Sequence, residues 1–282
     1  MGGASIGACA GTRFDAVVFA VYGTTRERAR ATAIEPVFRR VADAVGVPCE
    51  LAFCGPAVCR LLTRRGENVP ELERVLEHVA AAGARRVAVS SGMIVDGWAQ
   101  ANLRERVDAA AECLGLECAT VGAPLLADAA DVTHLAAALM EEWAFEPGVV
   151  TLFAGHGIGG PAESDYVRDQ DAFDAYGALG AAFARAGRAD LAVACLSDGA
   201  DAALRAARGL AEPGATVRLV PLMLAAGRHV LKNMGGADDC SWASALGAAG
   251  YAPLLCDCGL GELAAVQELF AHHARALCNI NE

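Results

Sequence analysis

Residues 217–229, VRLVPLMLAAGRH, form an apolar run that ends in a loop and a histidine. The first part of the run predicts a strand buried on both faces, and Pro221 ends its regular pairing. His229 then lies beyond the carboxyl end of a strand, where open α/β sheets bind their ligands. His229 is therefore a candidate ligand-binding residue, and a core histidine with satisfied hydrogen bonds is the alternative.

Apolar runs of the same kind recur along the chain and alternate with helical patterns. They predict strands at residues 16–21, 49–53, 86–90, 117–121, 149–153, 191–195, 217–221 and 252–256. Apolar residues at helical spacing predict helices at 27–45, 69–82, 99–113, 131–143, 172–186, 200–210, 242–249 and 262–277. Strands that alternate with helices are typical of α/β proteins, whose parallel sheets are covered on both faces.

The second half of the chain repeats the pattern of the first half. An offset of 132 residues places residues 17–19 on 149–151, Gly23 on Gly155 and Arg86 on Arg218. One offset that serves two separate strands indicates internal duplication of a four-strand unit. The sequence therefore predicts two Rossmann-like parallel-sheet domains facing a cleft, with boundaries at residues 1–135 and 136–282.

Composition and charge exclude several classes of protein. The chain has 282 residues, 55% of them hydrophobic, and a net charge of −11. This charge provides no basic surface for nucleic acid. No apolar run is long enough to span a bilayer, and the N-terminus lacks a signal-peptide pattern, so we expect a cytoplasmic protein without a membrane partner. The alanine-rich helices leave room for a homo-oligomer, but no motif specifies one.

Cysteine and glycine motifs suggest two further kinds of site, and neither matches a known spacing. Cys49, Cys54 and Cys59 are five residues apart, and Cys256 and Cys258 form a close pair. These spacings fit no common zinc or iron–sulfur pattern, so we expect the thiols to behave as small hydrophobes. The run GHGIGG at residues 155–160 lacks the G-x-G-x-x-G spacing, which disfavours a dinucleotide site.

Two histidines share the same setting in the second half. His156 and His229 each follow a predicted buried strand, and each stands beside or near a glycine. Neutral imidazoles suit first-row divalent metals, and two ligands hold a metal weakly. This pattern favours a protein that holds a metal transiently and passes it on.

Six ordered segments resemble the anaerobic sirohydrochlorin cobaltochelatase family, which belongs to the class II chelatases. The segments are AVYGTTRERAR, AFCGPAVCRLL, VGAPLL, GHGIGGPAESDY, VPLMLAAGRHVLKNMGGADDCSWASALGAAG and CGLGELAAVQELFAHH. The resemblance covers about residues 16–278 and implies a bilobal chelatase fold. It also implies insertion of cobalt(II) into sirohydrochlorin, with a divalent metal and a tetrapyrrole as substrates and no organic cofactor.

The resemblance assigns the metal site to specific positions. His156 and His229 fall on the family's metal-binding histidines, which would also accept the protons that the macrocycle releases. Ser197 stands where the family has a glutamate, and the neighbouring Asp198 is the candidate third ligand. The alternative for Asp198 is an ordinary acid at a helix N-terminus.

The remaining candidates are residues that would contact the tetrapyrrole. They are Tyr22, Gly23, Thr24, Met93, Tyr166, Arg228 and Lys232. Met93 takes the place of a family histidine, and an apolar wall residue is the alternative to a soft ligand. Arg228 and Lys232 replace an acidic and an uncharged residue, and they would bind substrate carboxylates if they face away from the metal.

Two functions are compatible with these departures from the family pattern. The first is an active chelatase for cobalt, or alternatively for iron or nickel. The second is a non-catalytic tetrapyrrole- or metal-binding relative, and a position of Asp198 beside both histidines would favour the enzyme. His78, His272 and His273 have no partner at ligand spacing, and we expect them at the surface or in an interface.

Overall fold

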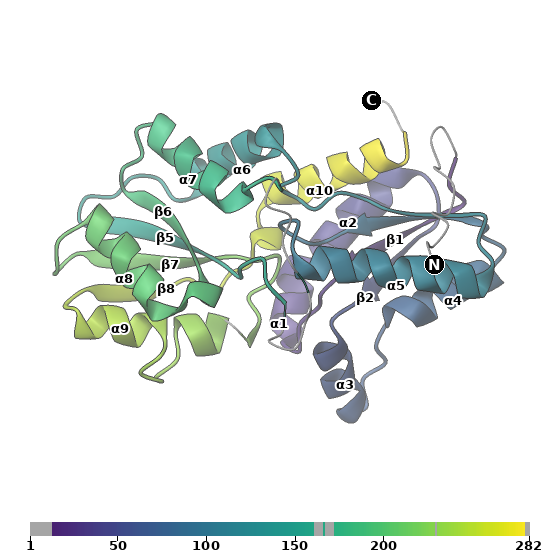
Figure 1. Cartoon of the computed structure of the whole chain (residues 1–282), viewed down its shortest axis with the longest axis horizontal. Coiled ribbons are helices and arrows are strands. Elements are labelled where there is room, and N and C mark those ends of the chain that lie inside the picture. Colours follow the sequence, from purple (N-terminus) through teal and green to yellow (C-terminus); the bar gives the residue numbers. More distant parts are fainter. Residues whose placement is uncertain (1–12, 161–165, 167–171, 229, 280–282) are drawn as a thin grey trace.

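The structure is a computed structural model that describes residues 13–160, 166, 172–228 and 230–279. It contains two four-stranded parallel sheets flanked by helices, one in each of two lobes that lie side by side in Figure 1. This arrangement confirms the predicted fold class. Among the described residues, no helix combines the length and the apolar character needed to cross a membrane.

The first lobe is built on a sheet whose strand order is β2-β1-β3-β4. Its strands are β1 (Ala16–Val21), β2 (Cys49–Phe53), β3 (Arg86–Ser91) and β4 (Cys118–Val121). Its helical segments are α1 (Glu27–Ala29), η1 (Arg30–Ile34), α2 (Glu35–Val45), α3 (Pro56–Arg64), α4 (Leu72–Ala81) and α5 (Trp98–Leu114). Because β1 is buried over its whole length, its sequence is apolar throughout.

The second lobe has the equivalent strand order β6-β5-β7-β8. Its strands are β5 (Val149–Gly155), β6 (Leu191–Cys195), β7 (Thr216–Leu222) and β8 (Ala252–Leu255). The helical segments of this half of the chain are α6 (Ala129–Glu142), α7 (Ala175–Arg185), η2 (Leu196–Asp198), α8 (Gly199–Leu210), η3 (Val230–Met234), α9 (Trp242–Ala248), η4 (Leu260–Glu262) and α10 (Ala264–Leu277). In both sheets, the order reverses beside the first strand of the lobe, and this is where α/β sheets bind ligands.

The shared strand order agrees with a duplicated four-strand unit, but the repeat is not ungapped. Val17 of β1 pairs with Ala88 of β3, a separation of 71 residues. Val150 of β5 pairs with Val217 of β7, a separation of 67 residues. A single offset of 132 therefore cannot align both strand pairs, and a gap of four residues between the first and third strands is needed.

The last helix of the chain returns to the first lobe. Helix α10 packs along α2 and against α6, as the yellow and purple ribbons of Figure 1 show. Phe270 of α10 makes an edge-on contact with Phe19 of β1, with ring centroids 5.8 Å apart. The division of the chain at residue 135 stays a prediction, and α10 is a segment of the second half that packs in the first lobe.

A polar contact fixes α10 to α6. The His273 Nε2 atom lies 2.8 Å from Asp131 Oδ1, and the two side chains are only 14% and 11% exposed. The sequence predicted a surface or interface position for His273, and the residue lies where α10 contacts α6. By contrast, His78 and His272 are exposed, as expected.

Three further differences concern the helices. The predicted helix at 27–45 contains a π-helical turn, η1, between α1 and α2. Helix α3 was not predicted from the sequence, although Pro56 occupies a first-turn position that favours helix initiation. A second π-helical turn, η3, follows the loop after β7. Each of these segments is shorter than the window over which helical periodicity is informative.

Candidate functional site

The strand β5 delivers His156 to the carboxyl edge of the second sheet, where the side chain is exposed. Gly157 follows with φ 102°, a conformation that favours glycine, and a Cβ atom there would overlap the Ser197 side chain. The glycine therefore lets the loop that carries His156 lie directly against Ser197.

The buried side chain of Tyr176 packs against the same loop. Tyr176 of α7 packs against Gly155 so closely that a Cβ atom there would lie 2.6 Å from its Cζ. The backbone N–H groups of His156 and Gly157 donate hydrogen bonds to the Tyr176 hydroxyl, while burial raises the pKa of Tyr176. The neutral phenol thus fixes the backbone at His156. No sequence pattern had indicated this residue.

Asp198 reaches the same edge from the neighbouring strand. Gly155 of β5 pairs with Cys195 of β6, so the residues after each strand lie close together. The Ser197 hydroxyl donates to Asp198 Oδ1 over 3.1 Å, and both side chains are exposed. Asp198 is the N-cap residue of α8, but its side chain accepts no capping hydrogen bond. Its carboxylate is therefore not used by the helix.

The nearby Cys195 thiol is protonated at neutral pH in the metal-free protein. Burial, together with the carboxylates of Asp198 and Asp174, raises its pKa to about 11. Because only the thiolate is a good ligand, Cys195 stays a neutral neighbour of the site.

The loop after β7 approaches the same edge of the sheet. Leu222 of β7 pairs with Gly155 of β5, so the chain that follows both strands emerges on one side. Arg228 in this loop and Lys232 in η3 are both exposed. His229 lies outside the described residues, and its role stays a prediction.

The first lobe faces these loops with the segment after β1. Tyr22 is 39% exposed, and its ring packs over Gly55, where a Cβ atom would lie 2.9 Å from Tyr22 Cδ1. Gly23 adopts φ 85° and lies against the Phe53 ring. Thr24 is only 4% exposed, and its Oγ1 lies 3.4 Å from the Cβ position of Gly227. Tyr22 is therefore open to a ligand, whereas Thr24 contacts the other lobe.

Two other predicted substrate contacts have different surroundings. Met93 is 6% exposed and belongs to a hydrophobic cluster that includes Val89 and Leu103. These apolar surroundings fit the alternative of an apolar wall residue, and contact of Met93 with the substrate stays a prediction. Tyr166 is partly buried, and the residues on either side of it lie outside the described ones.

Within the part of the chain that the structure describes, no three His, Cys, Asp or Glu side chains form a group that could hold a metal ion. His156 and Asp198 come from adjacent strand ends, and the predicted third partner is His229. Burial raises the pKa values of Cys49 and Cys54 to about 12, which disfavours metal binding by these thiols. The thiol of Cys258 donates to Cys256 and lowers the pKa of Cys256.

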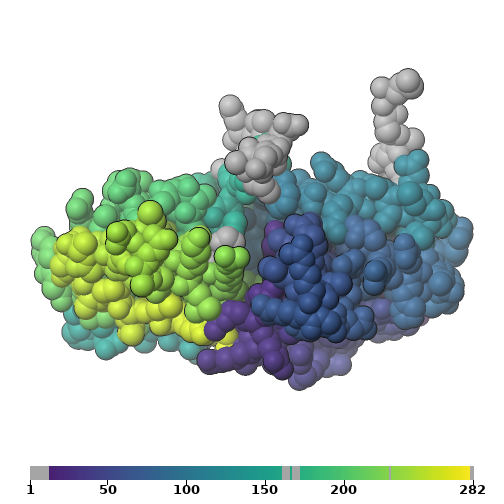
Figure 2. Space-filling view, turned by 90° about the horizontal axis from the view of Figure 1, so that it is seen from below, coloured from purple at the N-terminus to yellow at the C-terminus, as the bar shows by residue number. Residues whose placement is uncertain are grey.

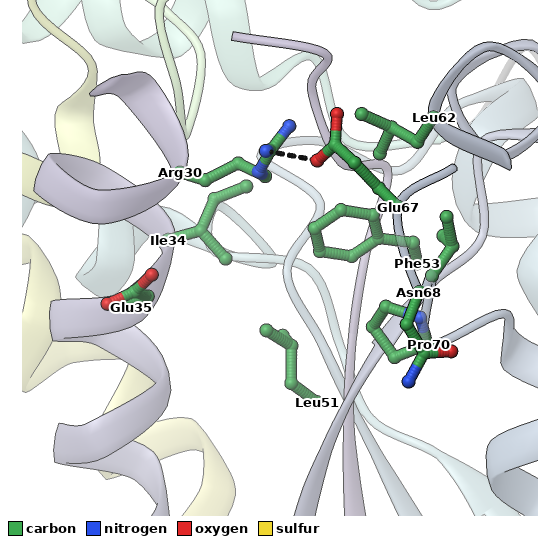
Figure 3. A pocket seen from close by; sticks show the side chains of 10 residues that line it. Arg30, Ile34, Glu35, Leu51, Phe53, Leu62, Glu67, Asn68 and Pro70 are labelled. Carbon is green, nitrogen blue, oxygen red and sulfur yellow. Dashed lines mark hydrogen bonds and ion pairs between the residues drawn. The ribbon is translucent and has the colours of Figure 1, made fainter. Parts of the chain in front are cut away.

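The surface is hollowed between the two lobes. Figure 2 shows this hollow between the yellow-green second lobe and the blue segment that contains α3. A separate cavity of about 180 Å³ lies inside the first lobe, lined by apolar residues that include Ile34 and Phe53. Figure 3 shows the ion pair between Arg30 and Glu67 at this cavity, with 2.6 Å between Nη2 and Oε2. The cavity therefore differs from the hollow that the strand-end loops border.

The family model for cobalt chelatase (CbiK) matches residues 15–279. The chain belongs to the cobalt chelatase family. It is 32% identical to "Sirohydrochlorin cobaltochelatase CbiKC" from Nitratidesulfovibrio vulgaris, over 73% of this chain and 70% of that protein. It is 28% identical to "Sirohydrochlorin cobaltochelatase" from Salmonella typhimurium, over 81% of this chain and 83% of that protein.

Solved structures agree with the fold of this family member. SirB from Bacillus subtilis, solved with Fe3+, has a TM-score of 0.59 at 14% identity and covers 93% of this chain and 95% of its own. DR2241 from Deinococcus radiodurans, a multi-domain protein with structural similarity to chelatases, has a TM-score of 0.52 at 17% identity. That match covers 92% of this chain and 54% of DR2241. At such identities, these likenesses concern the fold alone.

Proposed function

We propose that this enzyme inserts cobalt(II) into sirohydrochlorin. The observation that carries the proposal is the family match over residues 15–279, which includes both sheets and the loops at their edges. Two relatives named as sirohydrochlorin cobaltochelatases match most of the chain and support the same substrate pair. Metal insertion transfers protons and no electrons, so the proposal includes no organic cofactor.

In this proposal, His156 and Asp198 hold the incoming cobalt(II) together with His229. His156 is exposed on a loop fixed by Tyr176, and the Asp198 carboxylate is not used as a helix cap. Imidazole and carboxylate groups are suitable ligands for cobalt(II). A neutral imidazole can also accept the pyrrole protons that the macrocycle gives up as the metal enters.

Because the protein is acidic, cationic side chains are needed at the binding site to bind the carboxylates of the tetrapyrrole. The net charge of −11 repels a polycarboxylate substrate over long distances. Arg228 and Lys232 are exposed and form no ion pair with a described carboxylate, so both can meet substrate carboxylates. Tyr22 offers an aromatic face from the opposite lobe. These residues are the proposed substrate contacts.

The proposal is tested by anaerobic incubation of the protein with sirohydrochlorin and cobalt(II). We expect the visible absorption spectrum to change to that of the metallated macrocycle faster than in a control without protein. Parallel reactions with iron(II) and nickel(II) measure metal preference, which the ligand types alone do not set. A spectrum that shifts on binding, with cobalt entering no faster than in buffer, would instead identify a non-catalytic tetrapyrrole-binding relative.

A further inference from the structure

Arg26 joins the two lobes through one side chain. Its guanidinium donates to both carboxylate oxygens of Asp257, over 2.5 Å and 2.7 Å. The same Nη1 atom donates to the backbone oxygen of Ala226 over 2.6 Å. Arg26 belongs to the segment after β1 in the first lobe, whereas Asp257 and Ala226 follow β8 and β7 in the second lobe. This contact is an inter-lobe clamp with a forked donor geometry.

The clamp is partly shielded from water. The side chains of Arg26 and Asp257 are 22% and 33% exposed. The hydrogen bonds from Arg26 lower the pKa of Asp257, so the pair is ionised at neutral pH. In Figure 2 the purple N-terminal segment meets the yellow-green lobe below the hollow. Arg28 is 71% exposed, and its Nη1 atom lies 4.0 Å from Asp257 Oδ2, beyond hydrogen-bond distance.

The bond to Ala226 matters because of where Ala226 stands in the chain. It stands three positions before His229 in the sequence, and Gly227 in between lies against Thr24 of the first lobe. The other histidine loop is held in a similar way. The Trp98 N–H donates to the Ile158 backbone oxygen over 2.8 Å, two residues after His156. Each histidine loop of the second lobe is therefore fixed by a hydrogen bond from the first lobe.

We propose that Arg26 is a positioning residue for cobalt insertion, which holds residues 225–228, the part of the loop that precedes His229, in the position that the metal site requires. Arg26 acts through the backbone of Ala226 and does not touch the metal. This inference rests on the proposed function, because it assigns a task to the loop of a proposed ligand. In this proposal, the Arg26 side chain has two roles. Its ion pair with Asp257 joins the lobes, and its hydrogen bond to the Ala226 backbone positions the loop.

Two variants separate these roles. Arg26→Ala removes the ion pair and the bond to Ala226, whereas Asp257→Asn weakens the ion pair and leaves the guanidinium able to reach Ala226. Loss of a group that orients a metal ligand typically lowers metal affinity or activity by about 10–100-fold. For Arg26→Ala we expect a fall of at least about tenfold in kcat/KM for cobalt(II), with an unchanged KM for sirohydrochlorin.

For Asp257→Asn we expect a similar loss of thermal stability but a much smaller loss of cobalt turnover. Arg26→Lys is the second variant if Arg26→Ala does not fold, and we expect it to lose cobalt turnover because one ammonium cannot reproduce the forked contact. Arg39→Ala, which removes an exposed ion pair within α2, is the control and should behave as wild type.

Two results would overturn the inference: an Arg26 variant with cobalt turnover close to wild type, or losses of turnover that follow the losses of melting temperature in all variants. Titration of the wild-type protein and each variant with cobalt(II) alone gives a readout that does not depend on insertion. If the wild-type protein inserts no cobalt, the proposed function fails. The titration then still shows whether Arg26 places the metal-binding loop.

Discussion

At the scale of single residues, the departure from the family pattern that bears on the third metal ligand lies at Ser197 and Asp198. Ser197 packs against Gly157, in the loop of His156, and donates to the Asp198 carboxylate. This carboxylate caps no helix, and it stands at the strand-end edge that also carries His156. We propose that Asp198 is a displaced acidic ligand, one residue beyond the position to which the resemblance assigns a glutamate.

Replacement of Asp198 by asparagine tests this interpretation. We expect Asp198→Asn to lower kcat/KM for cobalt(II) at least about tenfold, because an amide is a weaker ligand than a carboxylate for a divalent metal. Unfolding should change little, since the residue is exposed. Asp201→Asn is the matched control, because Asp201 is an exposed acid in the first turn of the same helix. Equal activities of the two variants would show that Asp198 is an ordinary surface acid.

At the scale of elements, α10 connects the lobes. It is formed by the end of the chain, packs on α2 in the first lobe, and contacts α6 through His273 and Asp131. Phe270 is 1% exposed and lies in a buried cluster that also contains Phe19 and Phe153, from the first strands of the two sheets. The packing of α10 against the first lobe is therefore part of the hydrophobic core that joins the two lobes.

Truncation of Phe270 measures this contribution. We expect Phe270→Ala to lower the free energy of unfolding by about 3–5 kcal/mol, as for other buried aromatic residues. His272→Ala on the same helix removes an exposed ring and should cost less than about 0.5 kcal/mol. Urea denaturation of both variants gives the comparison. Equal midpoints for the two would mean that α10 does not stabilise the lobes.

At the scale of the whole molecule, the fold followed from the sequence more fully than the site did. Apolar runs predicted each strand to within about two residues. The signal is clearest for β1, which is buried over its whole length and is apolar throughout. An apolar run indicates that a segment is buried, but it does not indicate which other segment it packs against. This signal therefore missed that α10 packs on α2 and that Thr24 faces Gly227.

The inter-lobe clamp shows the same limit. The segment AVYGTTRERAR contains three arginines at alternate positions, and nothing in their spacing distinguishes Arg26 from Arg28 or Arg30. Only the folded chain places Arg26 beside Asp257, which stands 231 positions later in the sequence. Contacts between such distant positions cannot be inferred from local periodicity.

The most direct test of the account is the initial rate of cobalt(II) insertion into sirohydrochlorin by the variant His156→Ala/His229→Ala. A matched control variant, His78→Ala/His272→Ala, removes two exposed histidines on helices α4 and α10. We predict that the first variant falls to the rate measured without protein and that the control retains the wild-type rate. A rate close to wild type in the first variant would contradict the assignment of the metal site to these two loops.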